Sequence, residues 1–301
     1  MLDSRLTEQR NPRSAAMDRL DAAGLVVLIN GEDRTVAEAV GRESENITRA
    51  VEVLVETFRA GGRLFYVGAG TSGRLGVLDA AEMPPTYGTD PELVQGIIAG
   101  GYEALVRAQE GAEDHPEDGA RDMETRGVRS GDFVLGIATS GTTPYVHGAL
   151  ARARALGART GFLLCTPPPA ELLATHDVVI APLVGPEVVT GSTRMKAGTA
   201  TKMVLNTLTT AAMVLTGKVW GNLMVDLQVT CRKLEDRGRR ILQATVGVDP
   251  GDAARLLEEA DGQVRTAIAM HRLGVDAPEA RRRLEEAGGR VAALLPPDGA
   301  P

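Results

Sequence analysis

Apolar runs alternate with helical patterns through the middle of the chain. Runs that are apolar throughout predict five strands, at residues 64–67, 93–98, 133–137, 160–164 and 178–180. Helical spacing between them predicts helices at 74–81, 102–110, 144–156 and 171–174. Strands without polar alternation, separated by helices, are typical of a parallel sheet covered on both faces. We therefore predict an α/β domain with a doubly wound, five-stranded parallel sheet, whose binding residues follow the strands' carboxyl ends.

Helical patterns also flank this region on both sides. They predict helices at 14–23, 25–30, 35–59, 192–216 and 225–245, and three short amphipathic helices at 252–260, 263–271 and 278–287. Composition shifts at Asp249-Pro250-Gly251, where the three short helices begin. The predicted organisation is an N-terminal helical arm (1–55), the α/β domain (56–219), a connecting helix (220–248), a small three-helix domain (249–295) and a disordered tail (296–301).

Composition excludes several classes of protein. The net charge is −7, with 33 basic and 40 acidic residues along the chain, which argues against a nucleic-acid partner. The two cysteines, Cys165 and Cys231, are far apart, so neither a disulfide framework nor a metal site is indicated. The N-terminus lacks the apolar core of a signal peptide, and no apolar run reaches membrane-spanning length. We expect a cytoplasmic protein with no membrane partner.

The first candidate site is the glycine-rich loop after the first strand. Gly68, Gly70 and Gly73 fit the spacing of a dinucleotide-binding turn, but no acidic residue ends the second strand to hold a ribose. What remains is Thr71 and Ser72, two hydroxyls at a helix start, which suit a phosphate ester. A plain turn, with glycines for tight packing, fits equally well.

A second hydroxyl-rich loop follows the third strand. Ser140, Thr142 and Thr143 surround Gly141, and Pro144 opens the next helix. A helix N-cap would account for one of these hydroxyls but not for three. Two such loops at one sheet edge favour a phosphate site over simple capping.

A third segment starts the long helix near residue 192. It offers the hydroxyls of Ser192 and Thr193 and the cations Arg194 and Lys196. The cations could bind a sugar phosphate or a carboxylate. They could equally form salt bridges with Glu187 or another surface acid, and the sequence leaves both interpretations open.

The candidate proton-transfer groups are carboxylates. Pro84 and Pro85 are expected to end the helix that starts in the first loop, which places Glu82 at its carboxyl end. The helix dipole disfavours negative charge there, which suits a general acid. Glu113 lies near the end of the next predicted helix, where most acidic residues are simply solvated.

Several segments resemble the N-acetylmuramic acid 6-phosphate etherase family. The similarity is carried by residues 68–86, 110–114, 138–146 and 185–200, and also by 8–12 and 222–226. It covers nearly the whole chain in order, and Met83 is a mild departure, at a position where relatives can carry Cys. The resemblance implies a SIS (sugar isomerase) fold with a small ubiquitin-associated-like helical domain at the C-terminus.

The resemblance also implies an activity and a site. A lyase of this family cleaves the D-lactyl ether of N-acetylmuramic acid 6-phosphate during peptidoglycan recycling and amino sugar catabolism, without a metal or redox cofactor. Glu82 corresponds to the proton donor and Glu113 to the base. The expected substrate ligands are Thr71, Ser72, Ser140, Thr142, Thr143, Ser192, Thr193 and Lys196. A homodimer is expected, with the N-terminal helices as candidates for the interface.

Two other functions share this fold. A sugar-phosphate isomerase would use the same phosphate loops but release no lactate. A non-enzymatic sugar-phosphate sensor, like the glucokinase regulatory protein, would normally carry a second SIS domain, and this chain holds one. Because these functions share one fold, they are distinguished by the residues of the site.

Overall fold

The computed structural model describes residues 5–226 and 232–294. The chain divides into two compact units, the first comprising Met1–Ala81 and Glu92–Thr209 and the second Glu82–Pro91 and Thr210–Pro301. The finer domain bounds expected from the sequence stay predictions, and the predicted tail 296–301 lies outside the described residues. In the part of the chain that the structure describes, no helix is both long and apolar enough to cross a lipid bilayer.

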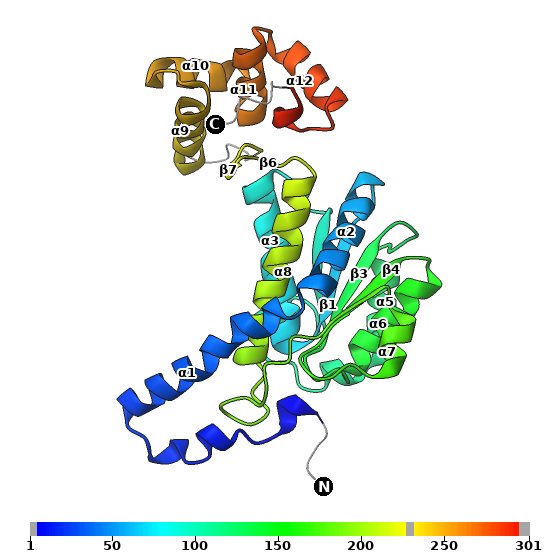
Figure 1. Ribbon diagram of the computed structural model, residues 1–301. Helices are drawn as coiled ribbons and strands as arrows, with labels where there is room; N and C mark the ends of the chain where they lie inside the picture. The colour runs from blue at the N-terminus through cyan, green and yellow to red at the C-terminus, as the bar shows by residue number, and fades with distance from the viewer. Residues whose placement is uncertain (1–4, 227–231, 295–301) are drawn as a thin grey trace. The chain divides into compact units, whose positions relative to one another are not determined.

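The first unit is built on a five-stranded parallel sheet (Figure 1). The strands are β1 (Leu64–Gly68), β2 (Val94–Ile98), β3 (Phe133–Ile137), β4 (Arg159–Leu163) and β5 (Val178–Ile180). Their order is β2-β1-β3-β4-β5, which confirms the predicted doubly wound sheet. The chain crosses from β1 to one side and then to the other, so the last residues of β1 and β3, Gly68 and Ile137, are partners in adjacent strands. Such a switch point is where open α/β sheets bind ligands.

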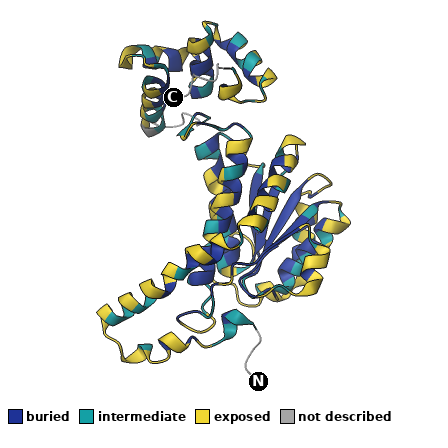
Figure 2. Cartoon of the chain, in the orientation of Figure 1, coloured by how far each residue is buried: buried dark blue, intermediate teal, exposed yellow. Residues whose placement is uncertain are grey.

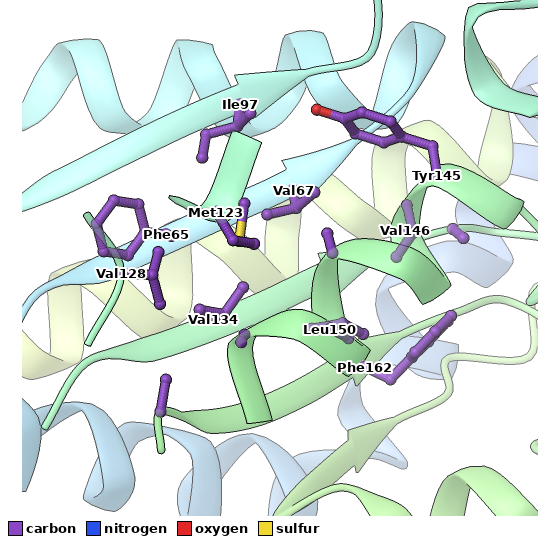
Figure 3. Close-up of a cluster of buried hydrophobic side chains, with 14 of the residues drawn as sticks. Phe65, Val67, Ile97, Met123, Val128, Val134, Tyr145, Val146, Leu150 and Phe162 are labelled. Carbon is purple, nitrogen blue, oxygen red and sulfur yellow. The ribbon is translucent and has the colours of Figure 1, made fainter. Parts of the chain in front are cut away.

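Helices cover both faces of this sheet, whereas α1 (Ala22–Gly41) extends away from it. The other helices of this region are α2 (Ser44–Arg59), α3 (Gly70–Tyr87), α4 (Glu103–Val106), α5 (Pro116–Thr125), α6 (Pro144–Ala155), α7 (Ala170–Thr175) and α8 (Lys196–Leu215). On one face Val146 and Leu150 of α6 belong to the same buried cluster as Phe65 and Val134 (Figure 3). On the other face α3 packs so closely on Tyr66 that Gly76 has no room for a side chain.

Several helix predictions were wrong in their bounds. The predicted helix 14–23 is replaced by short 3-10 turns, Pro12–Ser14 and Met17–Arg19, and 35–59 is interrupted between α1 and α2. The helix α5 was missed because its sequence is strongly polar and Met123 is its one large apolar side chain, although Gly119 lies directly against the backbone of α6. These errors share a cause, since apolar spacing reports burial and not the continuity of a helix.

The prediction that two prolines end α3 was also wrong. Pro84 and Pro85 lie inside α3, which continues to Tyr87. Each proline lacks one backbone donor, but Met83 and Tyr87 are buried on this last stretch, and burying apolar side chains offsets lost hydrogen bonds. Glu82 therefore lies within the helix and not at its end, so the dipole argument for a general acid no longer applies to it.

The second unit has its own core. It holds α9 (Arg232–Val246), α10 (Pro250–Glu259), α11 (Val264–Leu273) and α12 (Ala277–Glu286), with the short hairpin of β6 (Val219–Trp220) and β7 (Leu223–Met224). The three short helices after Asp249 are confirmed. Their side chains pack with α9 and Trp220 into one buried cluster, whereas the hairpin was not predicted. Figure 2 shows a buried centre in this unit as in the first.

Candidate active site

A cavity of about 550 Å³ lies where β1 and β3 end. We call it the hydroxyl-lined cavity. Seven hydroxyl residues line it: Thr71, Ser72, Thr139, Ser140, Thr142, Thr143 and Thr193. The charged residues in its lining are Arg5, Glu8, Glu113 and Asp114. Its size and its few polar groups at a switch point are typical of a small-ligand site.

The first loop packs tightly against the sheet and also contributes to the cavity lining. A Cβ on Gly73 would lie 2.6 Å from Cγ1 of Ile98, and one on Gly68 would lie 2.7 Å from the nitrogen of Gly73. These two glycines therefore let α3 pack against the ends of β1 and β2, as a plain turn would require. Thr71 and Ser72, in the first turn of α3, line the cavity. The sequence offered these interpretations as alternatives, and the structure contains both features.

The second loop presents its hydroxyls at the start of α6. The hydroxyl oxygens of Ser140 and Thr142 lie 3.0 Å apart, and Thr143 is the N-cap residue without a side-chain capping bond. Capping therefore does not account for the hydroxyl of Thr143. Two helix N-termini, those of α3 and α6, thus contribute hydroxyl residues to one cavity, and a helix N-terminus favours a bound anion.

The third predicted segment contributes less. Gly191 and Thr193 line the cavity, whereas the lining does not include Ser192 or Lys196. The carboxylate of Glu187 accepts hydrogen bonds from the backbone nitrogens of Lys196, at 3.0 Å, and Ala197, at 2.9 Å. An internal carboxylate therefore already caps the N-terminus of α8. The N-terminus of α8 is therefore occupied by the carboxylate of Glu187, whereas the N-termini of α3 and α6 lie at the cavity.

Lys196 does not line the cavity and is paired with Glu32 of α1. Its side chain is 2% exposed, and its ammonium lies 2.7 Å from Oε2 of Glu32, whose side chain is equally buried. Asn11 donates to the same oxygen at 2.8 Å, and Arg13 pairs with the other oxygen at 2.6 Å. Burial alone would raise the pKa of Glu32, but its bonds to Lys196 and Asn11 and the nearby positive charges hold it below its usual value. Lys196 therefore forms a salt bridge, which was one of the two interpretations of the sequence. Its partner is the buried Glu32 and not Glu187 or a surface acid.

The two candidate carboxylates differ in placement. Glu113 is exposed in a short 3-10 turn, Ala112–Asp114, and lines the cavity. The predicted helix 102–110 ends early, at Val106, and Gly111 adopts a left-handed conformation before the turn. Glu82 is exposed on α3 in the second unit. Its role as proton donor, like that of Glu113 as base, stays a prediction.

Sequence reasoning missed the N-terminal contribution to the cavity. Arg5 and Glu8 line it, and so does Asp114 beside Glu113. Glu8 stood within one of the segments that carried the family resemblance, residues 8–12, so a signal was present there. Arg5 carried no local signal, because a single arginine ahead of a short turn fits no binding motif.

The cavity can bind an anion and move a proton. Helix N-termini and hydroxyls suit a phosphate ester, and a carboxylate at the rim suits general acid–base chemistry. The N-terminal SIS domain model of the glucokinase regulatory protein matches residues 46–154, which include β1, α3, β2 and β3. The fold and this match place the chain in the SIS class of α/β proteins.

Curated relatives identify the family within that class. The chain is 55% identical to N-acetylmuramic acid 6-phosphate etherase from Rhodopirellula baltica over 270 residues, which cover 90% of this chain and 89% of that protein. It is 56% identical over 265 residues to the Salinibacter ruber etherase, covering 88% and 85%, and 55% identical over 267 residues to that of Symbiobacterium thermophilum, covering 89% and 88%. The chain belongs to the N-acetylmuramic acid 6-phosphate etherase family, which confirms the resemblance seen in the sequence.

Proposed function

We propose that this protein cleaves the D-lactyl ether bond of N-acetylmuramic acid 6-phosphate, giving N-acetylglucosamine 6-phosphate and D-lactate. One observation carries the proposal: in a chain with this family membership, two hydroxyl-bearing helix N-termini and the carboxylate of Glu113 line a single cavity. The reaction belongs to peptidoglycan recycling and amino sugar catabolism in the cytoplasm.

The chemistry avoids direct displacement at an unreactive ether. Opening of the sugar ring exposes an aldehyde at C1, which acidifies the proton on C2. Glu113 removes that proton, and a double bond forms between C2 and C3 as the C3–O bond breaks. Glu82 gives a proton to the departing lactate oxygen, and water then adds across the double bond to restore a hydroxyl on C3. Two carboxylates near C2 and C3 are enough for these transfers.

The phosphate would lie against the hydroxyls of the two loops. Thr71 and Ser72 at the start of α3, and Ser140, Thr142 and Thr143 at the start of α6, supply donors, with Thr193 facing them from the third segment. Helix N-termini favour an anion without requiring a cationic side chain. The ion pair of Lys196 with Glu32 argues against Lys196 as a direct phosphate ligand.

We further propose that the protein is a homodimer formed through its N-terminal helices. Figure 1 shows α1 projecting beyond the layers of the first unit, and Val26 and Val27 on it are 65% and 73% exposed. Large apolar side chains on a projecting helix gain by burial against a second copy. Sedimentation of the wild type as a dimer, and of a Val26→Asp, Val27→Asp variant as a monomer, would support this; a wild-type monomer would contradict it.

The decisive test of the activity is incubation with N-acetylmuramic acid 6-phosphate and an assay for D-lactate. In ¹⁸O-labelled water, the hydroxyl at C3 of the sugar product should carry the label. Label in lactate instead would exclude elimination followed by hydration. A sugar-phosphate isomerase would convert an aldose to a ketose with no lactate, and a sensor would bind the sugar phosphate without turning it over.

A further inference from the structure

The proposed substrate carries two anionic groups, a phosphate and the carboxylate of its lactyl ether. The hydroxyl loops account for the phosphate without a cation, so the lactyl carboxylate needs a separate partner. This inference rests on the proposed function, because the second anion is present in N-acetylmuramic acid 6-phosphate and absent from N-acetylglucosamine 6-phosphate.

Among the described residues that line the cavity, Arg5 is the one cationic side chain. The same lining holds three carboxylates, those of Glu8, Glu113 and Asp114. Three negative charges in one cavity disfavour the entry of an anionic ligand. A guanidinium matches a carboxylate with two parallel hydrogen bonds and keeps its charge at any physiological pH.

The turn that carries Arg5 is fixed to the first unit. The backbone nitrogen of Leu6 donates to the hydroxyl of Thr166, just after β4, at 3.2 Å, and Thr7 is fully buried. The nitrogen of Glu8 donates to the carbonyl oxygen of Arg5 at 3.1 Å, which closes the turn. The side chain of Arg5 therefore extends from a backbone that is already fixed, which lowers the entropy cost of using that side chain as a ligand.

The residues that follow are bonded to the loop before α8. Asn11 donates to the carbonyl of Pro186 at 3.2 Å, and Ser14 donates to that of Val188 at 2.7 Å. The same loop carries Gly191, where an added Cβ would lie 3.3 Å from a carboxylate oxygen of Glu8. The N-terminal segment and this loop thus form one continuous wall of the cavity, with Arg5 and Thr193 both in its lining.

We propose that Arg5 binds the carboxylate of the lactyl group and is the residue that distinguishes a lactyl-bearing sugar phosphate from one without it. Arg5 then recognises the part of the substrate that leaves, whereas the hydroxyl loops recognise the part that stays. The substrate and the sugar product, which lacks the lactyl carboxylate, should therefore respond differently to the loss of Arg5.

The test compares substrate turnover with product inhibition in Arg5→Gln. A charge-assisted hydrogen bond contributes about 1.5–3 kcal/mol, so kcat/KM for N-acetylmuramic acid 6-phosphate should fall roughly 10- to 100-fold. The inhibition constant of N-acetylglucosamine 6-phosphate, which lacks the carboxylate, should stay within about twofold. Arg5→Lys should retain part of the activity, because it keeps the charge but loses the paired geometry.

Arg10→Gln is the matched control, since Arg10 is exposed in the same segment and does not line the cavity. It should leave both constants unchanged, and the thermal unfolding temperature of all three variants should equal that of the wild type. Equal weakening of substrate and product in Arg5→Gln, or no change in either, overturns the role of Arg5 alone. Absence of lactate release from the wild type overturns the proposed function itself.

Discussion

Carboxylates occur both in a buried cluster outside the cavity lining and in the lining itself, but their surroundings differ. In the buried cluster, Glu32, Glu187 and Lys196 have protein partners within 3.0 Å. In the cavity lining, Glu113 is exposed, and the hydroxyl oxygens of Ser140 and Thr142 lie 3.0 Å apart. A buried charge with a full set of partners holds elements together, whereas an exposed carboxylate in a cavity keeps capacity for a substrate. Residue type alone did not separate the two groups, because Lys196 was expected among the substrate ligands and does not line the cavity.

The largest effect on activity is expected from a substitution in the cavity lining. Glu113→Gln keeps the shape of the side chain but removes its capacity to accept a proton, so kcat for lactate release should fall about 10²- to 10⁴-fold. The free energy of unfolding should not change, because Glu113 is exposed. Exchange of the C2 proton with deuterated solvent should stop as well. Glu110→Gln, at an exposed neighbour outside the cavity lining, should behave as wild type, and undiminished C2 exchange in Glu113→Gln would remove this residue as the base.

Substitutions in the buried pair of Lys196 and Glu32 are expected to change the stability of the protein. Lys196→Met leaves the buried carboxylate of Glu32 without its ammonium partner, which should lower the free energy of unfolding by about 3–5 kcal/mol in a urea titration. A second change, Glu32→Gln, should recover part of this loss, since it removes a charge that has lost its buried partner and keeps only the exposed Arg13. Preserved stability combined with weaker inhibition by N-acetylglucosamine 6-phosphate would assign Lys196 to the phosphate instead.

The smallest effect separates the hydroxyls. Ser140→Ala removes one donor of several in the second loop, so the inhibition constant of N-acetylglucosamine 6-phosphate should rise about two- to tenfold, with stability unchanged. Ser130→Ala, exposed in the turn before β3, provides the comparison and should leave that constant as it is. Identical constants in the two variants would place the phosphate away from the second loop.

The sequence predicted the sheet and two of the cavity's loops because both depend on short-range patterns. Apolar runs located all five strands to within a residue, and hydroxyls beside glycines located the loops after β1 and β3. Partners distant in sequence left no such pattern. Lys196 and Glu32 are 164 positions apart, so no local spacing could show that this cation is neutralised inside the protein.

The course of α3 was hidden for a different reason. Pro84 and Pro85 are the strongest local signal for the end of a helix, yet burial of Met83 and Tyr87 overrides it. Tertiary packing of this kind appears in no single-residue preference. The sequence therefore located the helix that carries Glu82 but misplaced its end.

The hydrogen bond between the N-terminal turn and the residue Thr166 after β4 has a consequence for the order in which the chain folds. The bond from Leu6 to Thr166 spans 160 positions, and closing so long a loop costs chain entropy before any contact rewards it. The strands β1 and β3 leave the ribosome well before Thr193, which completes the wall. A newly made or refolding chain should accordingly show the spectroscopic signal of its sheet before it can retain a sugar phosphate, and ligand binding should be among the last properties it gains.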